Sequence, residues 1–116
     1  MALLATALLA GCGRPEPSAA IGDAGRGKDV ILRGACGSCH VIPGIPLADG
    51  RVGPSLAGIG SRAVLGGVLT NTPQHLAQWL EDPQRFAPGG AMPKDVLGRQ
   101  EARDAAAYLE TIGGRA

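Results

Sequence analysis

The residues with the clearest chemistry in this sequence are two cysteines and a histidine that stand close together. They form the motif Cys36-Gly37-Ser38-Cys39-His40, in which two residues separate the thiols and the imidazole follows directly. Thiols at this spacing can bind a metal ion, cycle between dithiol and disulfide, or bond covalently to a cofactor. The rest of the sequence has to decide among these three kinds of site.

The pattern C-x-x-C-H is the attachment signature of c-type haem. Its thiols can reach the two vinyl groups at one edge of a porphyrin, and His40 then offers its imidazole to the iron. A thioredoxin-like redox pair is expected within a βαβ pattern, which this sequence lacks. A zinc site needs further ligands, and the remaining candidates, Cys12 and His75, are badly placed for a cage of four. The sequence therefore predicts one haem c, bound covalently through Cys36 and Cys39.

A second axial ligand for the iron has few candidates, namely Met92, His75 or no protein group. Met92 lies in the sequence G-G-A-M-P, where glycines let the backbone approach a cofactor and Pro93 stiffens the position after the ligand. His75 falls in the first turn of a predicted helix, where a capping or solvent-facing role is ordinary. Met92 is therefore the favoured ligand. Ligation by histidine and methionine raises the reduction potential compared with two nitrogen ligands.

Three segments are predicted to be helices that position these residues, and no segment shows the sustained alternation of a strand. The first helix spans 25–34 and leads straight into the cysteine pair. The second begins with Thr72 as N-cap and is closed by Pro83. The third spans 98–112 and carries one apolar stripe before a glycine. Long loops rich in glycine and proline lie between them, and loops of such length are usually functional or wrapped around something.

The composition fits one small domain that encloses a bound group. The 116 residues include 19 glycines and 9 prolines but only one each of Trp, Tyr and Phe. A hydrophobic content of 45% argues for a packed domain, yet these side chains offer little bulk for a core. The net charge of +1 excludes the basic surface of a nucleic-acid-binding protein and gives no reason for strong attraction to anionic lipid.

The start of the chain resembles the export signal of a bacterial lipoprotein. An apolar run over 2–10 is too short to span a bilayer but has the length of a signal's apolar region. Leu9-Ala10-Gly11-Cys12 resembles a lipobox, which implies cleavage before Cys12 and lipid on its thiol. Alternatives are an ordinary cleaved signal or an uncleaved apolar tail. The expected organisation is a signal peptide at 1–11, a flexible lipid-anchored tether at 12–25 and a domain at 26–116.

From 25 to 113 the sequence resembles the class I c-type cytochromes. The family's elements appear in order: a first helix, C-G-S-C-H, G-P-S-L, a helix ending L-A-Q-W-L-E-D-P, the G-G-A-M-P loop and a last helix containing A-A-A-Y-L. The resemblance implies an all-α fold, in which three to four short helices wrap around one covalently bound haem. Gly27 and Tyr108 resemble the small and aromatic pair at which the family's first and last helices cross.

The resemblance also implies roles for three further residues around the haem. The carbonyl of Pro54 is expected to accept the Nδ1 proton of His40, so that Nε2 faces the iron. Trp79 is expected to lie against the haem beside the methionine. Arg62 resembles the family's arginine that neutralises a haem propionate, with a solvated surface arginine as the alternative.

By resemblance, the predicted function is that of a one-electron carrier of a bacterial periplasmic respiratory chain, and not of an enzyme. Its implied partners are a quinol-oxidising cytochrome complex and a haem-copper oxidase, reached from the periplasmic side of the membrane that holds the lipid anchor. Within the family, V-L-T-N-T-P is most similar to small bacterial cytochromes and to cytochrome domains associated with haem-copper oxidases. Two alternatives stay open: a fixed haem c subunit of a membrane oxidase or dehydrogenase, and a ligand-binding or peroxidase-like haem protein.

Overall fold

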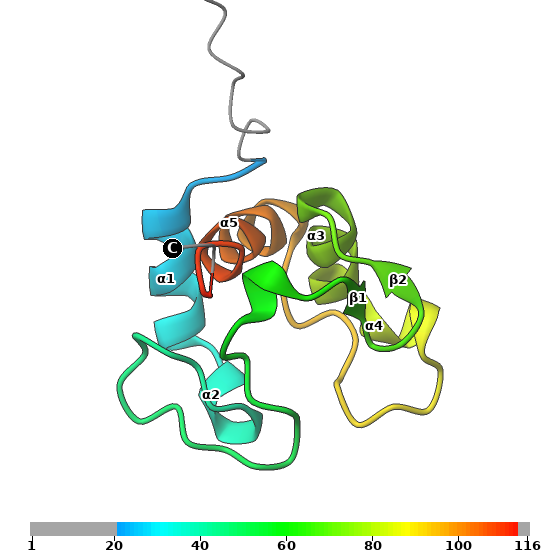
Figure 1. Cartoon of the computed structure of the whole chain (residues 1–116), viewed down its shortest axis with the longest axis horizontal. Helices are drawn as coiled ribbons and strands as arrows, with labels where there is room; N and C mark the ends of the chain where they lie inside the picture. Colours follow the sequence, from blue (N-terminus) through cyan, green and yellow to red (C-terminus); the bar gives the residue numbers. More distant parts are fainter. Residues whose placement is uncertain (1–20, 114–116) are drawn as a thin grey trace, which may run out of the picture.

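The computed structural model describes residues 21–113 of the chain. The expected signal peptide, Cys12 and most of the expected tether lie outside the described residues. Within them the fold is mostly helical, and a short hairpin joins the helices (Figure 1). Its elements are α1 (Ala24–Arg33), α2 (Cys36–Cys39), the 3-10 turn η1 (Ile59–Ser61), β1 (Val64–Leu65), β2 (Leu69–Thr70), α3 (Pro73–Glu81), α4 (Pro83–Phe86) and α5 (Arg99–Leu109). In this part of the chain no helix is both long and apolar enough to cross a membrane.

Helices α1 and α5 cross at direct backbone contact. A Cβ atom on the buried Gly27 of α1 would lie 1.8 Å from the carbonyl oxygen of Asp104 in α5, so only glycine fits there. The facing residues of α5 are also small, since Ala102, Ala105 and Ala106 are all buried. Gly27 therefore lies at the helix crossing, as the resemblance implied. The Tyr108 hydroxyl, in the last turn of α5, donates to the Pro43 carbonyl at 3.0 Å.

The folded unit begins earlier than the sequence suggested. Residues 21–25 were expected in the flexible tether, but the Arg103 side chain donates to the carbonyl of Ile21 at 2.9 Å. The Asp23 side chain caps α1 by accepting the backbone N–H of Arg26 at 2.8 Å. Because these bonds tie the segment to α5 and to the first turn of α1, residues 21–25 belong to the folded unit and not to the expected tether.

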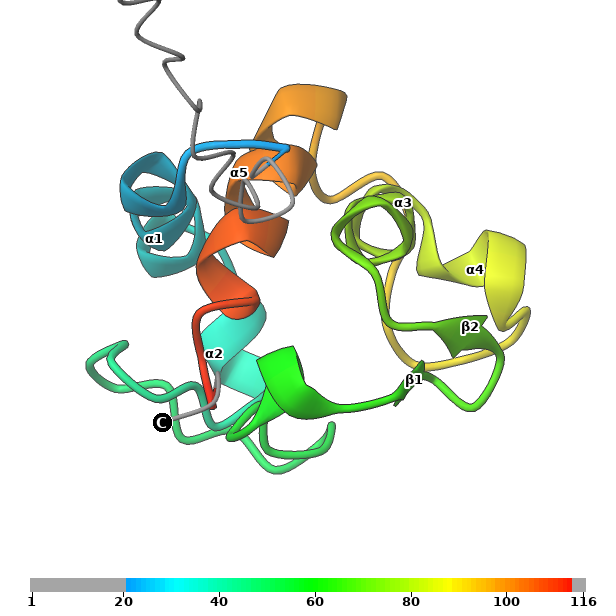
Figure 2. The same cartoon turned by 45° about the horizontal axis from the view of Figure 1, so that its top comes forward.

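Helix α3 packs on α5 and begins as predicted, with Thr72 accepting the backbone N–H of His75 at 3.0 Å. Pro83 was expected only to close this helix, but it also opens α4, because proline is well suited to a first helical position. The antiparallel hairpin β1–β2 was not expected, and its two-residue strands are too short to show alternation. Figure 2 shows α3, α4 and the hairpin together on one side of the molecule and α1 on the other, with α5 between α1 and α3.

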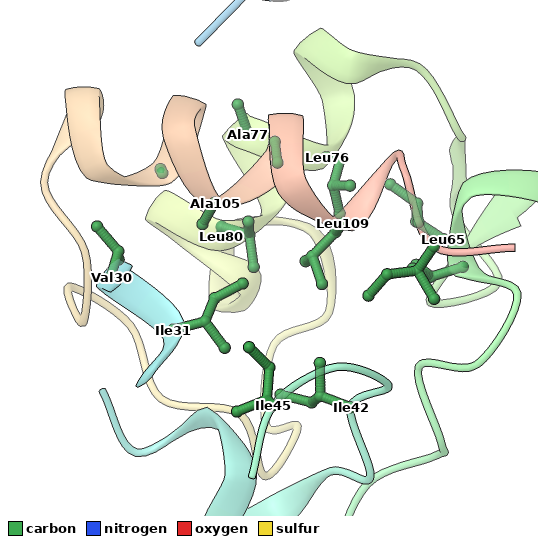
Figure 3. Close-up of a cluster of buried hydrophobic side chains, with 14 of the residues drawn as sticks. Val30, Ile31, Ile42, Ile45, Leu65, Leu76, Ala77, Leu80, Ala105 and Leu109 are labelled. Carbon is green, nitrogen blue, oxygen red and sulfur yellow. The ribbon is translucent and has the colours of Figure 1, made fainter. Parts of the chain in front are cut away.

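The core lies where α1, α3 and α5 face one another. Aliphatic side chains from these helices meet others from the 41–50 loop and from β1 (Figure 3). The members drawn and labelled there are Val30, Ile31, Ile42, Ile45, Leu65, Leu76, Ala77, Leu80, Ala105 and Leu109. Trp79 and Tyr108 are only partly buried against this cluster, so no aromatic side chain fills its centre among the described residues.

Asp104 is the buried charged residue of the described chain, at 4% exposure. Its carboxylate accepts the backbone N–H of Asp23 at 2.8 Å, the Arg26 Nε–H at 3.2 Å and the Gln100 amide at 3.0 Å. The Asp23 N–H lowers the pKa of Asp104 most, and Arg26 and Gln100 lower it further while burial opposes them. Asp104 thus joins the start of α1 to the middle of α5.

We expect Asp104→Asn to reduce the free energy of unfolding by about 1–3 kcal/mol at pH 7, because an amide cannot accept from all three donors. Since the folded-state pKa of Asp104 is lowered, its contribution is complete above the unfolded pKa of about 3.9 and is lost as pH falls through the folded value. Urea unfolding from pH 7 to pH 3 should therefore show the two proteins converging. Asp29→Asn, an exposed site on α1, is the control. A constant difference across this pH range would contradict the assignment.

Candidate functional site

A deep cleft of about 440 Å³ opens between α2 and the segment that follows α4. Its walls are mostly aliphatic, and Ile31, Leu80 and Leu109 of the core form part of its floor. Both long loops that the sequence singled out contribute to it, the first through 52–54 and the second through 91–93. The volume lies within the range of roughly 300–1,000 Å³ typical of cofactor sites.

The single-turn helix α2 brings the two cysteines to one side of this cleft. Cys36 and Cys39 are both half-buried free thiols, and both line the cleft together with His40. Burial raises the pKa of the Cys36 thiol, which keeps it protonated at neutral pH. A neutral thiol in an apolar wall is a poor partner for disulfide exchange, which needs the thiolate.

The imidazole of His40 is held by the loop that follows α2. Its Nδ1 lies 2.7 Å from the carbonyl oxygen of Pro54, which is the contact that the resemblance implied. A carbonyl can only accept, so Nδ1 carries the proton and Nε2 keeps a free lone pair. Gly53 allows this approach, since a Cβ there would lie 2.3 Å from His40 Cε1. The backbone N–H of Gly53 also donates to the Cys39 carbonyl at 2.7 Å.

Met92 reaches the cleft from a different part of the chain. It is half-buried against the core cluster and lines the cleft between Ala91 and Pro93. In Figure 1, α2 and the loop after α4 lie on opposite sides of the lower part of the molecule. The thioether and the imidazole are thus supplied by two separate elements that face one cavity.

Trp79 and Arg62 also line the cleft. The Trp79 ring stacks on Phe86, with centroids 6.3 Å apart and planes at 18°, and it packs against Gly66 of the hairpin turn, where a Cβ would lie 2.3 Å from the ring. The Arg62 guanidinium donates to the carbonyl of Ser55 and to that of Ala57, the latter at 3.3 Å. Arg62 thereby holds the loop that carries Pro54.

His75 is not brought to this site, since it is not among the residues that line the cleft. Its Nδ1 donates to the Thr70 carbonyl at 2.7 Å, which joins the start of α3 to β2. Within residues 21–113 no group of three or more His, Cys, Asp or Glu side chains is arranged to hold a metal ion.

Sequence reasoning missed the role of two glycines that line the cleft and leave room for its rings. Gly53 and Gly66 stand beside His40 and Trp79 because larger side chains would collide with those rings. The sequence pattern shows both as loop glycines among many, so only the close approach in the folded chain identifies them. Helix α4 was missed for a related reason, since a single turn leaves almost no periodicity to read.

A comparison with protein families decides what kind of cleft this is. The model of the cytochrome c family matches residues 24–113, which is the described fold almost from end to end. The chain belongs to the cytochrome c family. Its structure also superposes on cytochrome c2 from Rhodobacter sphaeroides with a TM-score of 0.60, over 82% of this chain and 99% of that one. At 21% identity this likeness shows the fold alone, and it confirms the expected class I cytochrome c fold.

The related sequences of this cytochrome include subunits of larger proteins. Cytochrome c oxidase subunit 2 of Alkalihalophilus pseudofirmus is 30% identical over 90 residues, which are 77% of this chain and 25% of that protein. The subunit 2 proteins of Bacillus sp. PS3 and Bacillus subtilis are each 32% identical, over 55% and 58% of this chain and 18% and 19% of theirs. The chain therefore spans no more than a quarter of the length of these relatives.

Membership of the family implies covalently bound haem c and haem-based electron transfer, and the cleft fits that group. Two thiols, an imidazole with a free Nε2 and a thioether face one apolar cavity of suitable size. Haem attachment by thioether bonds is also compatible with Cys36 and Cys39 both being free of disulfides.

We expect Gly53→Ala to destabilise this cytochrome by about 1–3 kcal/mol, because the new Cβ must displace the His40 ring or the Pro54 loop. Thermal unfolding of the purified haem-containing protein measures the loss. Gly98→Ala is the matched control, since a Cβ there meets only ordinary contact at 3.7 Å from Glu101 Oε1. Equal melting temperatures for the two variants would show that Gly53 does not need to be small.

Proposed function

We propose that this cytochrome is a one-electron carrier of a bacterial periplasmic respiratory chain. It holds a single haem c through Cys36 and Cys39, with His40 and Met92 as the axial ligands. The observation that carries the proposal is the convergence of these four side chains, from two separate elements, on one apolar cleft. With His40 and Met92 both holding the iron, the site would suit electron exchange better than the binding of small molecules.

Haem, when bound, supplies one-electron exchange at its iron, and the protein tunes that chemistry. The Pro54 carbonyl orients the His40 imidazole and raises its basicity by accepting the Nδ1 proton. The aliphatic lining excludes water, which reduces the reorganisation that accompanies a change of charge. Trp79 forms part of the wall on the side of Met92. Arg62 provides positive charge at the cleft for a haem propionate.

The cleft edge is suited to brief contact with an electron-transfer partner. Val52, Val64 and Val96 line the cleft and are 71%, 50% and 47% exposed, so they form an apolar rim at its mouth. The chain's net charge of +1 provides little long-range steering toward a charged partner. A small apolar rim of this kind fits a transient docking site, with a quinol-oxidising cytochrome complex as donor and a haem-copper oxidase as acceptor.

A lipid on Cys12 would compensate for weak steering by holding the carrier near its membrane partners. Confinement raises the effective concentration of a tethered module. Support for this part of the proposal comes from the sequence, in the apolar run and the lipobox-like L-A-G-C. The same features are the support for a location on the periplasmic side of a bacterial membrane.

A second candidate function is that of a fixed haem c subunit of a membrane oxidase. The specific observation in its favour is that three related sequences are cytochrome c oxidase subunit 2 proteins. A free carrier and a fixed subunit can share this fold, since both transfer electrons through one haem. They differ in whether the domain remains bound to the oxidase.

We expect Met92→Ala to remove the iron–sulfur charge-transfer band of the oxidised protein and to lower its reduction potential, because the thioether favours ferrous iron. Absorption spectroscopy and a redox titration measure both changes. His75→Ala is the control and should leave band and potential unchanged, since His75 does not line the cleft. A wild-type spectrum without the band, or one altered by peroxide, would favour the ligand-binding or peroxidase-like alternative.

We expect Cys12→Ser to move the protein from the membrane fraction to the soluble periplasmic fraction, because its anchor is lost. Fractionation of the native host, followed by mild detergent extraction, measures this change. A carrier should become soluble in the variant and should purify alone from the wild type. Retention of Cys12→Ser in the membrane, together with oxidase subunits, would support the fixed subunit instead.

A further inference from the structure

We infer that Gln84 is the positioning residue that holds Met92 in place for ligation, an inference that rests on the proposed axial role of Met92. Gln84 lies in α4 and does not line the cleft. Its Nε2 donates to the carbonyl of Met92 and to that of Gly90, both at 2.7 Å. Its Oε1 accepts the backbone N–H of Gly89 at 2.9 Å. One half-buried side chain thus uses both ends of its amide to bind three residues of the ligand loop.

The loop has little else in its backbone to hold it. The Gly90 N–H donates to the Ala87 carbonyl at 3.1 Å, and the next amide with a partner is that of Asp95, which donates to Glu81 at 3.3 Å. Among the described residues, no backbone N–H from 91 to 94 donates a hydrogen bond. On a loop held so loosely, the sulfur of a methionine can occupy many positions. Hydrogen bonds that restrict the loop before ligation reduce the entropy lost when the sulfur binds.

Gln84 can serve this purpose because α4 is itself held at both ends. Pro83, the first residue of the helix, is fully buried, and Asp82 caps it by accepting the Arg85 N–H at 3.3 Å. Phe86, the last residue, stacks on Trp79 in the cleft wall. A chain of contacts therefore runs from the cleft wall through α4 to the loop. The cleft wall therefore fixes the position of Gln84 through α4, and Gln84 in turn fixes that of the Met92 backbone.

Arg85, the neighbouring residue, has no comparable role. Its guanidinium lies 5.2 Å from the centroid of the Phe86 ring, and its side chain is exposed. The contacts to the loop therefore come from Gln84 alone among the long side chains of this single turn.

Two variants of the full haem-containing protein test the inference. Gln84→Glu at pH 7 keeps the size and the acceptor for Gly89 but replaces the donor to Met92 with an oxygen. Gln84→Met keeps the size and removes both functions. Gln78→Glu introduces the same charge on α3, at an exposed side chain without a hydrogen bond to the described residues, and serves as control. Far-UV circular dichroism checks the fold of each variant. If Gln84→Met does not fold, Gln84→Glu alone tests the inference.

The decisive measurement is the affinity of the oxidised protein for imidazole, which competes with the methionine for the iron. Loss of one or both Nε2 hydrogen bonds should tighten imidazole binding by about fivefold to thirtyfold in Gln84→Glu and Gln84→Met. The charge-transfer band should weaken in parallel, and Gln78→Glu should match the wild type. A residue with a merely structural role would lower the free energy of unfolding without changing imidazole affinity, and that result would overturn the inference.

The wild-type baseline separates this inference from the proposed function. A wild-type protein that shows no iron–sulfur band overturns the ligation by Met92, and the role of Gln84 falls with it. A wild-type protein that shows the band, together with wild-type imidazole affinity in Gln84→Glu, overturns the role of Gln84 alone.

Discussion

The close crossing of α1 and α5 is the constraint on which the rest of the structure depends. Gly27 brings the two backbones into contact, and Asp104 accepts hydrogen bonds from the start of α1. Helix α1, held there, ends at Arg33 and leads directly into α2, which presents the two thiols. The crossing also leaves one side of α5 free to pack against α3, which carries Trp79. Helices α1 and α3, which both contribute to the cleft, are therefore arranged around α5.

The two sides of the cleft that carry His40 and Met92 are built in different ways. On the histidine side, two hydrogen bonds of 2.7 Å join the end of α2 to the loop that carries Pro54. The Arg62 side chain holds the same loop by donating to the Ala57 carbonyl. On the methionine side, the loop that carries Met92 is held mainly by hydrogen bonds to Gln84 of the single-turn helix α4. The covalent attachment expected at the cysteines also falls on the histidine side. Under the proposed ligation, a change of ligand would therefore occur first at Met92.

Sequence patterns predicted the features whose signals are local or chemically distinctive. The N-cap at Thr72 and the C-x-x-C-H motif are of this kind, and the structure brings Cys36, Cys39, His40 and Met92 to one cleft. The patterns could not predict α4, because a single turn is stabilised by tertiary contacts such as the burial of Pro83. They also placed residues 21–25 in the tether, since a segment rich in glycine and alanine gives no sign that α5 will bind it. The role of Gln84 depends on distances between side chain and loop that no spacing reveals.

The cleft explains why so few aromatic residues are needed in this domain. Leucines, isoleucines, valines and alanines converge on the centre of the domain, yet a large cleft remains open beside them. Apolar walls facing water are costly, at about 25 cal/mol for each Å² exposed, so the fold without its cofactor is disfavoured relative to the fold that encloses it. A flat apolar group removes that cost by covering the walls. Under the proposed function, the same covering would leave an edge near the rim valines within reach of a partner, so one arrangement would serve both stability and electron exchange.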